Sequence, residues 1–507
     1  MKALFLVPPS EYNARGLPID RVYGCNYGFD YKPPIHFLQV ATYARDVLGW
    51  QVRLLDCPAE GVDARAFQAG AAREAWDVVL HWATYLSAVE DLEAARRIHA
   101  VHPETRFVFM GTAPTWKPEE FRVGRHSYCL LGEPEHTLRD LDAAWRGERP
   151  VEGIDGLGWF QADGQPARGG ARALLDVTTL PIPDRCLLHG RYRANRLEVE
   201  RITTMAVSRG CGFRCTFCCT NAIDQAIELE FKRGQAAYVE RPPLRKRTVE
   251  QIIAEFQDIA AQGYQGVEIA DNIFTWGKRR TQEICAGIAP LGLQWICLAR
   301  ANMLHDGEQI RAMADAGCKL VYMGSETFDD GLLEDCIKEI HVTDVIKAVQ
   351  TCRDNGVEPE ISVLIGASPN ESWRTVINSW RMSRRLGTRF VHFSVALPAP
   401  STAMYDEAVA KGWFVDGDFR PADNAREVII NLPNLSRGEL ELALKLAYAT
   451  QYLSPQGLWA QLSTVRRPRD LVHKGKGAAR LLGLLTEGRG GGGVQVPAGR
   501  VSPATTG

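Results

Sequence analysis

The sequence predicts an α/β protein: an N-terminal doubly wound, Rossmann-like parallel sheet, then a partial (β/α)6 barrel of the TIM type and a helical C-terminal region. Three observations predict this fold. Short apolar runs alternate with amphipathic segments up to residue 150, a strand-then-helix unit recurs about six times over residues 201–410, and helical periodicity follows. The 507 residues suffice for two or three domains.

The first domain is expected over residues 1–150, where five apolar runs are typical of buried parallel strands. These runs span 3–7, 52–55, 78–82, 107–110 and 128–131. A doubly wound sheet binds its ligand at the carboxyl ends of the strands. No G-x-G-x-x-G follows the first run, which argues against a dinucleotide.

Residues 151–200 are rich in Gly, Pro and Arg, and we interpret them as a connector with a short hairpin around Trp159 and Phe160. The barrel is expected over 201–410, and its chemistry belongs at the carboxyl rim of the strands. A capping box at 248–251 begins one of its helices. The expected barrel strands span 205–208, 267–270, 295–299, 320–324, 360–365 and 391–397.

The C-terminal helical region is expected over 411–486. Trp413, Phe414 and an amphipathic segment at 440–453 are expected to cap the barrel mouth. A basic run at 466–476 is interpreted as a solvated helix face, with contact to an anionic ligand as the alternative. Residues 487–507 have little to bury, which predicts a disordered tail.

Composition narrows the class of protein. The chain is 45% hydrophobic and 24% charged, and its net charge of -2 gives no electrostatic reason to bind nucleic acid. No leader opens the chain and no apolar run approaches the ~20 residues that cross a bilayer, so no membrane contact is expected. Thirteen cysteines without framework spacing favour a reducing, cytoplasmic location.

Three cysteines, Cys211, Cys215 and Cys218, carry the strongest chemical signal. Their spacing allows one loop to give three thiolates to a [4Fe-4S] cluster, which leaves one iron open to an amine and carboxylate chelator. A zinc site is the alternative, but it needs a second cysteine pair and none occurs. Cys219 is interpreted as a neighbour of the ligands, with a spare thiol as the alternative.

Beyond the cysteines, four further short motifs follow at 271–275, 324–327, 364–371 and 397–402. With these motifs in this order, residues 1 to about 480 closely resemble the radical S-adenosylmethionine (SAM) superfamily, in the branch with an N-terminal cobalamin-binding domain. Two residues depart from the family motifs: Thr327 stands where the family has Ser, and Ser401 where it has Gly.

The resemblance implies that Cys211, Cys215 and Cys218 hold the cluster and that other rim residues bind SAM. Arg300 is expected to pair with the SAM carboxylate, with an ordinary rim salt bridge as the alternative. For Asp271 the alternative is a helix cap. The expected SAM-binding residues are Phe217 near the adenine, Glu326 at the ribose, Asp271, Arg300 and Ile365.

The resemblance also implies that strand tips of the first domain hold cobalamin. The Asp-x-His-x-x-Gly signature is missing, because Pro58 stands where its His would be, so no histidine is expected on cobalt. Trp82 and Tyr85 are expected to cover the lower face of the corrin, with core aromatics as the alternative. The remaining expected cobalamin residues are Asp56, Gly111, Thr112, Ala113, Gly132 and Glu133.

The implied function is a methyltransferase that uses methylcobalamin and a 5'-deoxyadenosyl radical on an unactivated carbon, or on phosphorus, of a small biosynthetic substrate. An external donor of the flavodoxin or ferredoxin type is expected to reduce the cluster. No catalytic side chain is assigned. The alternatives are oxidation, cyclisation or ring rearrangement, and, from another class, a sensor without turnover.

Overall fold

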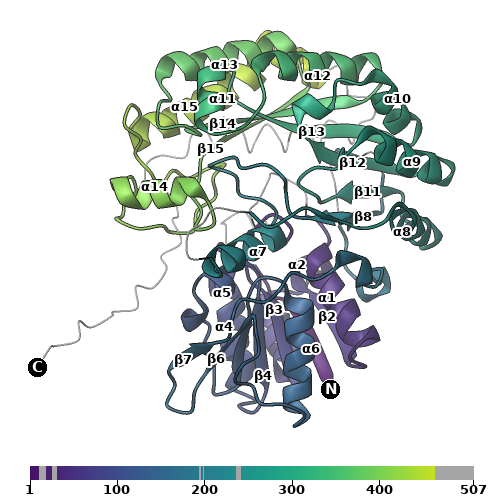
Figure 1. Cartoon of the computed structure of the whole chain (residues 1–507), viewed down its shortest axis with the longest axis vertical. Coiled ribbons are helices and arrows are strands. Elements are labelled where there is room, and N and C mark those ends of the chain that lie inside the picture. Colours follow the sequence, from purple (N-terminus) through teal and green to yellow (C-terminus); the bar gives the residue numbers. More distant parts are fainter. Residues whose placement is uncertain are drawn as a thin grey trace, which may run out of the picture.

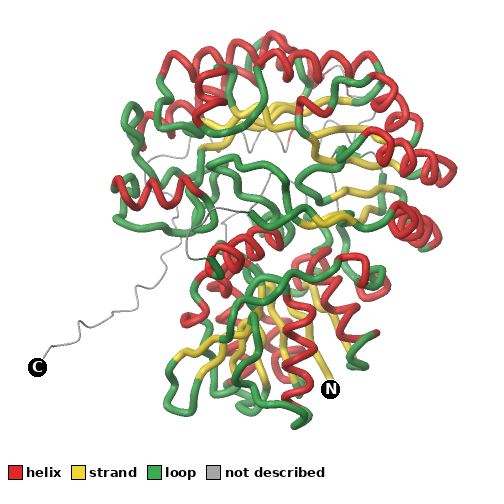
Figure 2. The backbone as a smooth tube through the Cα atoms, viewed as in Figure 1, coloured by secondary structure: helices red, strands yellow, loops and turns green. Residues whose placement is uncertain are grey.

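The computed structural model describes residues 1–10, 19–24, 31–192, 196–197, 199–235, 241–462 and 475. A first sheet with its helices occupies the lower half of the molecule in Figure 1, and a second sheet arches above it. Figure 2 shows the helices of the upper half on the outer side of this arch. The predicted fold class is therefore confirmed.

The first sheet has seven strands in the order β2-β1-β3-β4-β5-β6-β7. β1 to β5 are parallel, as the apolar runs predicted. β6 and β7 join antiparallel, so the hairpin expected around Trp159 extends this sheet beyond residue 150. The strands are β1 (Lys2–Val7), β2 (Gln51–Asp56), β3 (Val78–Trp82), β4 (Arg106–Met110), β5 (Ser127–Leu130), β6 (Leu157–Phe160) and β7 (Pro166–Arg168).

Apolar side chains explain why these strands form a central sheet. All five residues of β3 are buried, and both faces of the sheet are covered by apolar clusters. The helices of this half are α1 (Ile35–Asp46), α2 (Cys57–Glu60), α3 (Ala64–Ala69), α4 (Ala88–His99), α5 (Thr112–Trp116) and α6 (Pro134–Trp145).

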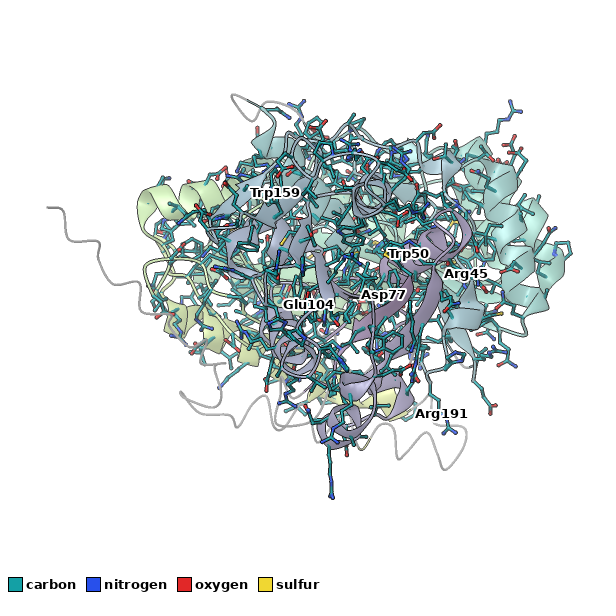
Figure 3. The ribbon with its side chains drawn as sticks, turned by 90° about the horizontal axis from the view of Figure 1, so that it is seen from below. Arg45, Trp50, Asp77, Glu104, Trp159 and Arg191 are labelled. Atoms are coloured by element: carbon teal, nitrogen blue, oxygen red, sulfur yellow. The ribbon has the colours of Figure 1, made fainter. Side chains whose placement is uncertain are left out.

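The carboxyl ends of the first sheet point toward the arch. Trp50, Asp77 and Glu104 lie just before β2, β3 and β4, and Figure 3 labels them in the view from below. The amino ends of the strands are therefore at the bottom of Figure 1, where the chain also begins. The edge expected to bind a ligand faces the second sheet.

The second sheet contains six parallel strands in the order β8-β11-β12-β13-β14-β15, as a partial barrel requires. Its strands are β8 (Ile202–Met205), β11 (Gly266–Ile269), β12 (Gln294–Ala299), β13 (Cys318–Glu326), β14 (Glu358–Ile365) and β15 (Phe390–Val395). A two-stranded ribbon of β9 (Ser208–Arg209) and β10 (Arg245–Lys246) lies beside it.

Helices connect the barrel strands. The expected capping box is confirmed: Thr248 Oγ1 accepts from the Gln251 N–H at 3.2 Å, and Gln251 Oε1 accepts from the Thr248 N–H at 3.1 Å. The helices are α7 (Ala222–Arg233), α8 (Val249–Ala261), α9 (Lys278–Ile288), α10 (Gly307–Asp315), α11 (Asp330–Asp335), α12 (Val342–Asp354) and α13 (Trp373–Leu386).

Three more helices follow the barrel: α14 (Ala403–Lys411), α15 (Arg437–Tyr452) and α16 (Pro455–Leu462). The amphipathic segment at 440–453 falls in α15, which covers the open edge of the second sheet. Tyr448 and Tyr452 donate to the Phe393 and Val391 carbonyls of β15, each at 2.8 Å. These hydroxyls provide hydrogen-bond partners for backbone groups on the outer edge of β15, on the side away from β14.

Two sequence predictions lie outside the described residues: the basic side chains at 466–476 and the tail at 487–507. Across the residues that the structure does describe, no helix has the length and apolarity to span a bilayer. The proposed domain boundaries stay predictions.

Buried ion pairs join the two halves. Arg209 of β9 contacts Glu133 at 2.9 Å and Glu135 at 2.5 Å, and Arg245 of β10 contacts Glu133 at 2.7 Å. Both carboxylates belong to the segment that follows β5. These contacts fix the half that carries the cysteine loop against the carboxyl edge of the first sheet.

Candidate active site between the two sheets

The loop that carries Cys211, Cys215 and Cys218 starts directly after β9, and two buried carboxyls hold its start. Asp271 accepts hydrogen bonds from the Val207 N–H at 2.7 Å and from the Ser208 hydroxyl. Asp224 of α7 accepts from the Gly210 N–H at 2.7 Å. Burial raises the pKa of Asp271 to about 7 and that of Asp224 to about 6.

These contacts give Asp271 a role in positioning the loop, because both of its oxygens are used by residues 207 and 208. Asn272 completes the anchor by donating to the second oxygen of Asp224 at 2.5 Å. A contact between Asp271 and SAM stays a prediction.

The three thiols lie close enough to influence one another. Cys215 is buried, and Cys211 and Cys218 are half-buried. Burial raises the pKa of Cys218, and the neighbouring Cys215 and Cys211 raise it further.

Positive charge surrounds this loop. Arg241 donates to the carbonyls of Phe213 at 2.7 Å and Cys215 at 3.0 Å. An Arg300 nitrogen lies 3.7 Å from the Cys215 sulfur. Lys338 and Arg241 lower the pKa of Cys218, against the larger effect of burial, and the thiolate is the form that ligates iron.

Glu326, the expected ribose ligand, ends β13 with a positive φ of 58°. Its carboxylate contacts the ammonium of Lys338 at 2.5 Å, and both side chains are buried. Burial lowers the pKa of Lys338, but Glu326 and Cys215 outweigh it, so the pKa is raised and the side chain stays cationic. Lys338 also lies 5.7 Å from the ring centroid of Phe217.

Sequence reasoning missed Lys338. It enters the site because Ile337 and Glu339 on either side adopt positive φ values of 51° and 54°. The only signal in the sequence was a lysine 12 positions after Glu326, which by itself indicates nothing.

Arg300, which follows β12, has different partners from those expected. Its guanidinium lies 3.5 Å from the ring centroid of Phe213 and donates to the backbone carbonyls of Lys338 and Glu339. It therefore holds the turn that delivers Lys338. Pairing of Arg300 with the SAM carboxylate stays a prediction.

Ile365 is buried at the end of β14, and its carbonyl accepts from the Ala396 N–H at 2.8 Å. The loop after it is closed by Glu371, which accepts from the Gly366 N–H at 2.7 Å. Lys338 thus links Glu326 to Phe217 of the cysteine loop, and Ile365 lies at the end of the next strand.

On the opposing sheet, two of the expected cobalamin residues have protein partners. Asp56 accepts from the hydroxyls of Tyr31 at 2.7 Å and Tyr192 at 3.0 Å, and burial raises its pKa to about 6. Glu133 pairs with the two arginines that join the halves. Trp82 is buried beside His36, with ring centroids 6.0 Å apart, in agreement with the core-aromatic alternative.

The tips of β4 and β5 are tightly packed. Gly111 has a φ of 104°, and a Cβ there would lie 2.6 Å from the Ala83 carbonyl oxygen. A Cβ on Gly132 would lie 2.9 Å from the Cβ of Glu230 on α7. Thr112, buried at the start of α5 next to Ala113, has a hydroxyl without a hydrogen-bond partner.

Tyr85, beyond β3, faces the barrel side. Its ring packs edge-on against Trp116 and Phe419, with centroids 5.6 and 5.3 Å apart. Its buried hydroxyl has no hydrogen-bond partner. Helix α7, which lies between the two sheets in Figure 1, brings Glu228 near this hydroxyl.

Comparison with known proteins agrees with this arrangement. Residues 205–381 match the family model of the radical SAM superfamily. An uncharacterised methyltransferase of Pyrococcus horikoshii is 27% identical over 468 residues, which cover 90% of this chain and 94% of the relative.

Two solved structures share the fold over most of the chain. One is the cobalamin-dependent S-adenosylmethionine radical enzyme OxsB, solved with aqua-cobalamin and S-adenosylmethionine. It has a TM-score of 0.68 and 15% identity, and the match covers 95% of this chain and 71% of OxsB. The other is the radical S-adenosylmethionine methyltransferase TsrM of Kitasatospora setae, solved with cobalamin and a [4Fe-4S] cluster. It has a TM-score of 0.59 and 19% identity, and the match covers 81% of this chain and 75% of TsrM.

Proposed function

We propose that this chain, in which residues 205–381 match the family model of the radical SAM superfamily, is a cobalamin-dependent methyltransferase that acts on an unactivated carbon of a small biosynthetic molecule. One observation carries the proposal. A three-thiol loop at the carboxyl edge of a partial barrel faces the carboxyl edge of a doubly wound sheet, so two cofactors can approach one substrate from opposite sides.

The residues on the barrel side fit a cluster and SAM. Cys211, Cys215 and Cys218 would hold three irons, and Arg241 and Arg300 lie beside the loop and would offset the negative charge of the ligated thiolates. Lys338 and Glu326 offer one charge of each sign next to Cys215, which suits the carboxylate and the ribose hydroxyls of SAM.

The residues on the sheet side fit a large neutral ligand with an amide periphery. The Thr112 hydroxyl is buried without a hydrogen-bond partner. Asp56, Gly111, Ala113, Gly132 and Glu133 would shape this site through backbone and packing, because the structure gives their side chains, where present, protein partners or close neighbours.

When bound, the cluster and SAM supply a radical that removes hydrogen from carbon, and cobalamin supplies the methyl group. The chain's own task is to position these groups and exclude water. Each cleavage of SAM consumes an electron, so we infer an external donor of the flavodoxin or ferredoxin type and a reducing, cytoplasmic setting.

The test is an anaerobic turnover assay on reconstituted protein with deuteromethyl SAM, a chemical reductant and a panel of small metabolites. A methyltransferase of this kind forms both 5'-deoxyadenosine and S-adenosylhomocysteine, and its product gains the labelled methyl group. 5'-Deoxyadenosine without S-adenosylhomocysteine would identify a non-methylating radical enzyme. Formation of neither compound with any member of the panel would contradict turnover and support a sensor.

A further inference from the structure

We propose that Glu228, Tyr85 and Tyr405 recognise a substrate that carries a protonated amine on an apolar or aromatic body. This inference rests on the proposed function, because it assigns the substrate class of the same site. The three side chains come from α7, from the segment after β3 and from α14.

Glu228 is the central observation. It is 3% exposed, and its Oε2 atom has no hydrogen-bond partner. A buried polar atom without a partner costs about 1–3 kcal/mol, so such an atom in a candidate site indicates a missing ligand. Burial raises the pKa of Glu228 to about 7; Arg241 opposes this shift and Asp224 adds to it. A cationic partner would restore the carboxylate form.

Tyr85 lies in the same region, because α7 packs against α5 and Trp116 of α5 packs against Tyr85. Its hydroxyl is also buried without a hydrogen-bond partner, and Glu228 and Tyr405 both lie close enough to influence its ionisation. Two hydroxyl oxygens and a carboxylate would offer three acceptors to the three donors of an ammonium group.

Aromatic rings form one wall of this site. Tyr85 and Tyr405 both pack against Phe419, with centroids 5.3 and 6.3 Å apart. Trp116 and Phe414 extend the same group of rings through Phe419, at 5.3 and 6.3 Å. Aromatic faces attract cations and also bury apolar groups, so the wall suits the amine and the body that carries it.

The position of the site indicates that it binds the substrate and neither cofactor. Arg241, which influences the Glu228 carboxyl, donates to the Phe213 and Cys215 carbonyls of the cysteine loop. Tyr85, on the other side, extends from the first sheet. A group bound at Glu228 would therefore lie between the two proposed cofactor sites, where a carbon that reacts with both must lie.

The experiment compares two isosteric probes, 2-phenylethylamine, which is an ammonium ion at pH 7, and 2-phenylethanol, on the full-length reconstituted protein. At about ten times its Kd, the amine is expected to raise the thermal midpoint by about 3 °C, while the alcohol is not. E228Q should abolish this rise, and Y85F should reduce it. E230Q is the matched control, because Glu230 lies on the same helix and also has an Oε2 atom without a hydrogen-bond partner, but its other oxygen pairs with Arg233.

Three results would each overturn the inference: no rise with the amine, an equal rise with the alcohol, or a rise that survives in E228Q. Loss of bound cobalamin from E228Q, with wild type insensitive to the amine, would assign Glu228 to a corrin amide instead. Iron content and SAM cleavage are measured on the same samples. Failure of the proposed function would remove those signals from the wild type, whereas failure of this inference would leave them intact.

Discussion

Replacing Arg209 by Met should strongly destabilise the contact between the two halves. Arg209 is 5% exposed and its guanidinium contacts Glu133 and Glu135. Glu133 keeps Arg245, but Glu135, which is fully buried, loses its ion-pair partner. Removing one member of a buried pair costs about 3–5 kcal/mol. For a domain of roughly 150–250 residues this cost lowers the thermal midpoint by about 6–20 °C.

The assay is calorimetric scanning of wild type and variant at one fixed rate. The double variant R209M/E135Q removes the stranded charge as well, so it should recover most of the lost stability. An unchanged thermal midpoint in R209M, or a lower midpoint in the double variant than in R209M, would show that a stranded charge at Glu135 is not the cause of the lost stability.

Three further predictions concern the cysteine loop and the ion pairs. C215A should lose the cluster and all 5'-deoxyadenosine formation, whereas C219A should keep both; iron analysis of the two variants decides whether Cys215 is a ligand. D271A leaves two donors of the loop without an acceptor, so it should cost about 1–3 kcal/mol and lower iron content, and an unchanged iron content with weaker SAM binding would instead make Asp271 a direct SAM ligand. Burial raises the pKa of Glu133, but Arg209 and Arg245 outweigh it, so the folded pKa lies below its ordinary value of 4.5. Its stabilising effect is therefore present above pH 4.5 and is lost as the pH falls through the folded pKa. The thermal midpoint of E133Q should therefore fall less steeply than that of the wild type when the pH is lowered from about 5 to about 3.

Local signals in the sequence were sufficient to predict most of the helices and strands and the cysteine loop. Ten of the eleven predicted parallel strands overlap an observed strand over most of their length, because a strand covered on both faces is apolar along much of its length. The first barrel strand is the exception: β8 spans Ile202–Met205 and not 205–208, because its two threonines hid it and Ser208 belongs to β9. The helix that starts after Thr248 was marked by its own capping box. The cysteine spacing likewise lies within one short segment.

Contacts between segments that are distant in the sequence could not be predicted from it. Arg209 and Glu133 are 76 positions apart, and nothing local to either one indicates the other. Lys338 reaches Glu326 only because two residues beside it adopt positive φ values, which neither Ile nor Glu favours. Glu228 appears in the sequence as an ordinary residue of an amphipathic helix, and its burial follows only from the packing of α7 against other elements.

The most direct test of the central claim is the metal and corrinoid content of protein purified without oxygen and reconstituted with iron, sulfide and hydroxocobalamin. We expect about four irons and one cobalamin per chain, with iron lost in C215A while cobalamin is retained. Zinc at the three thiols, or a protein that retains no corrinoid, would contradict it.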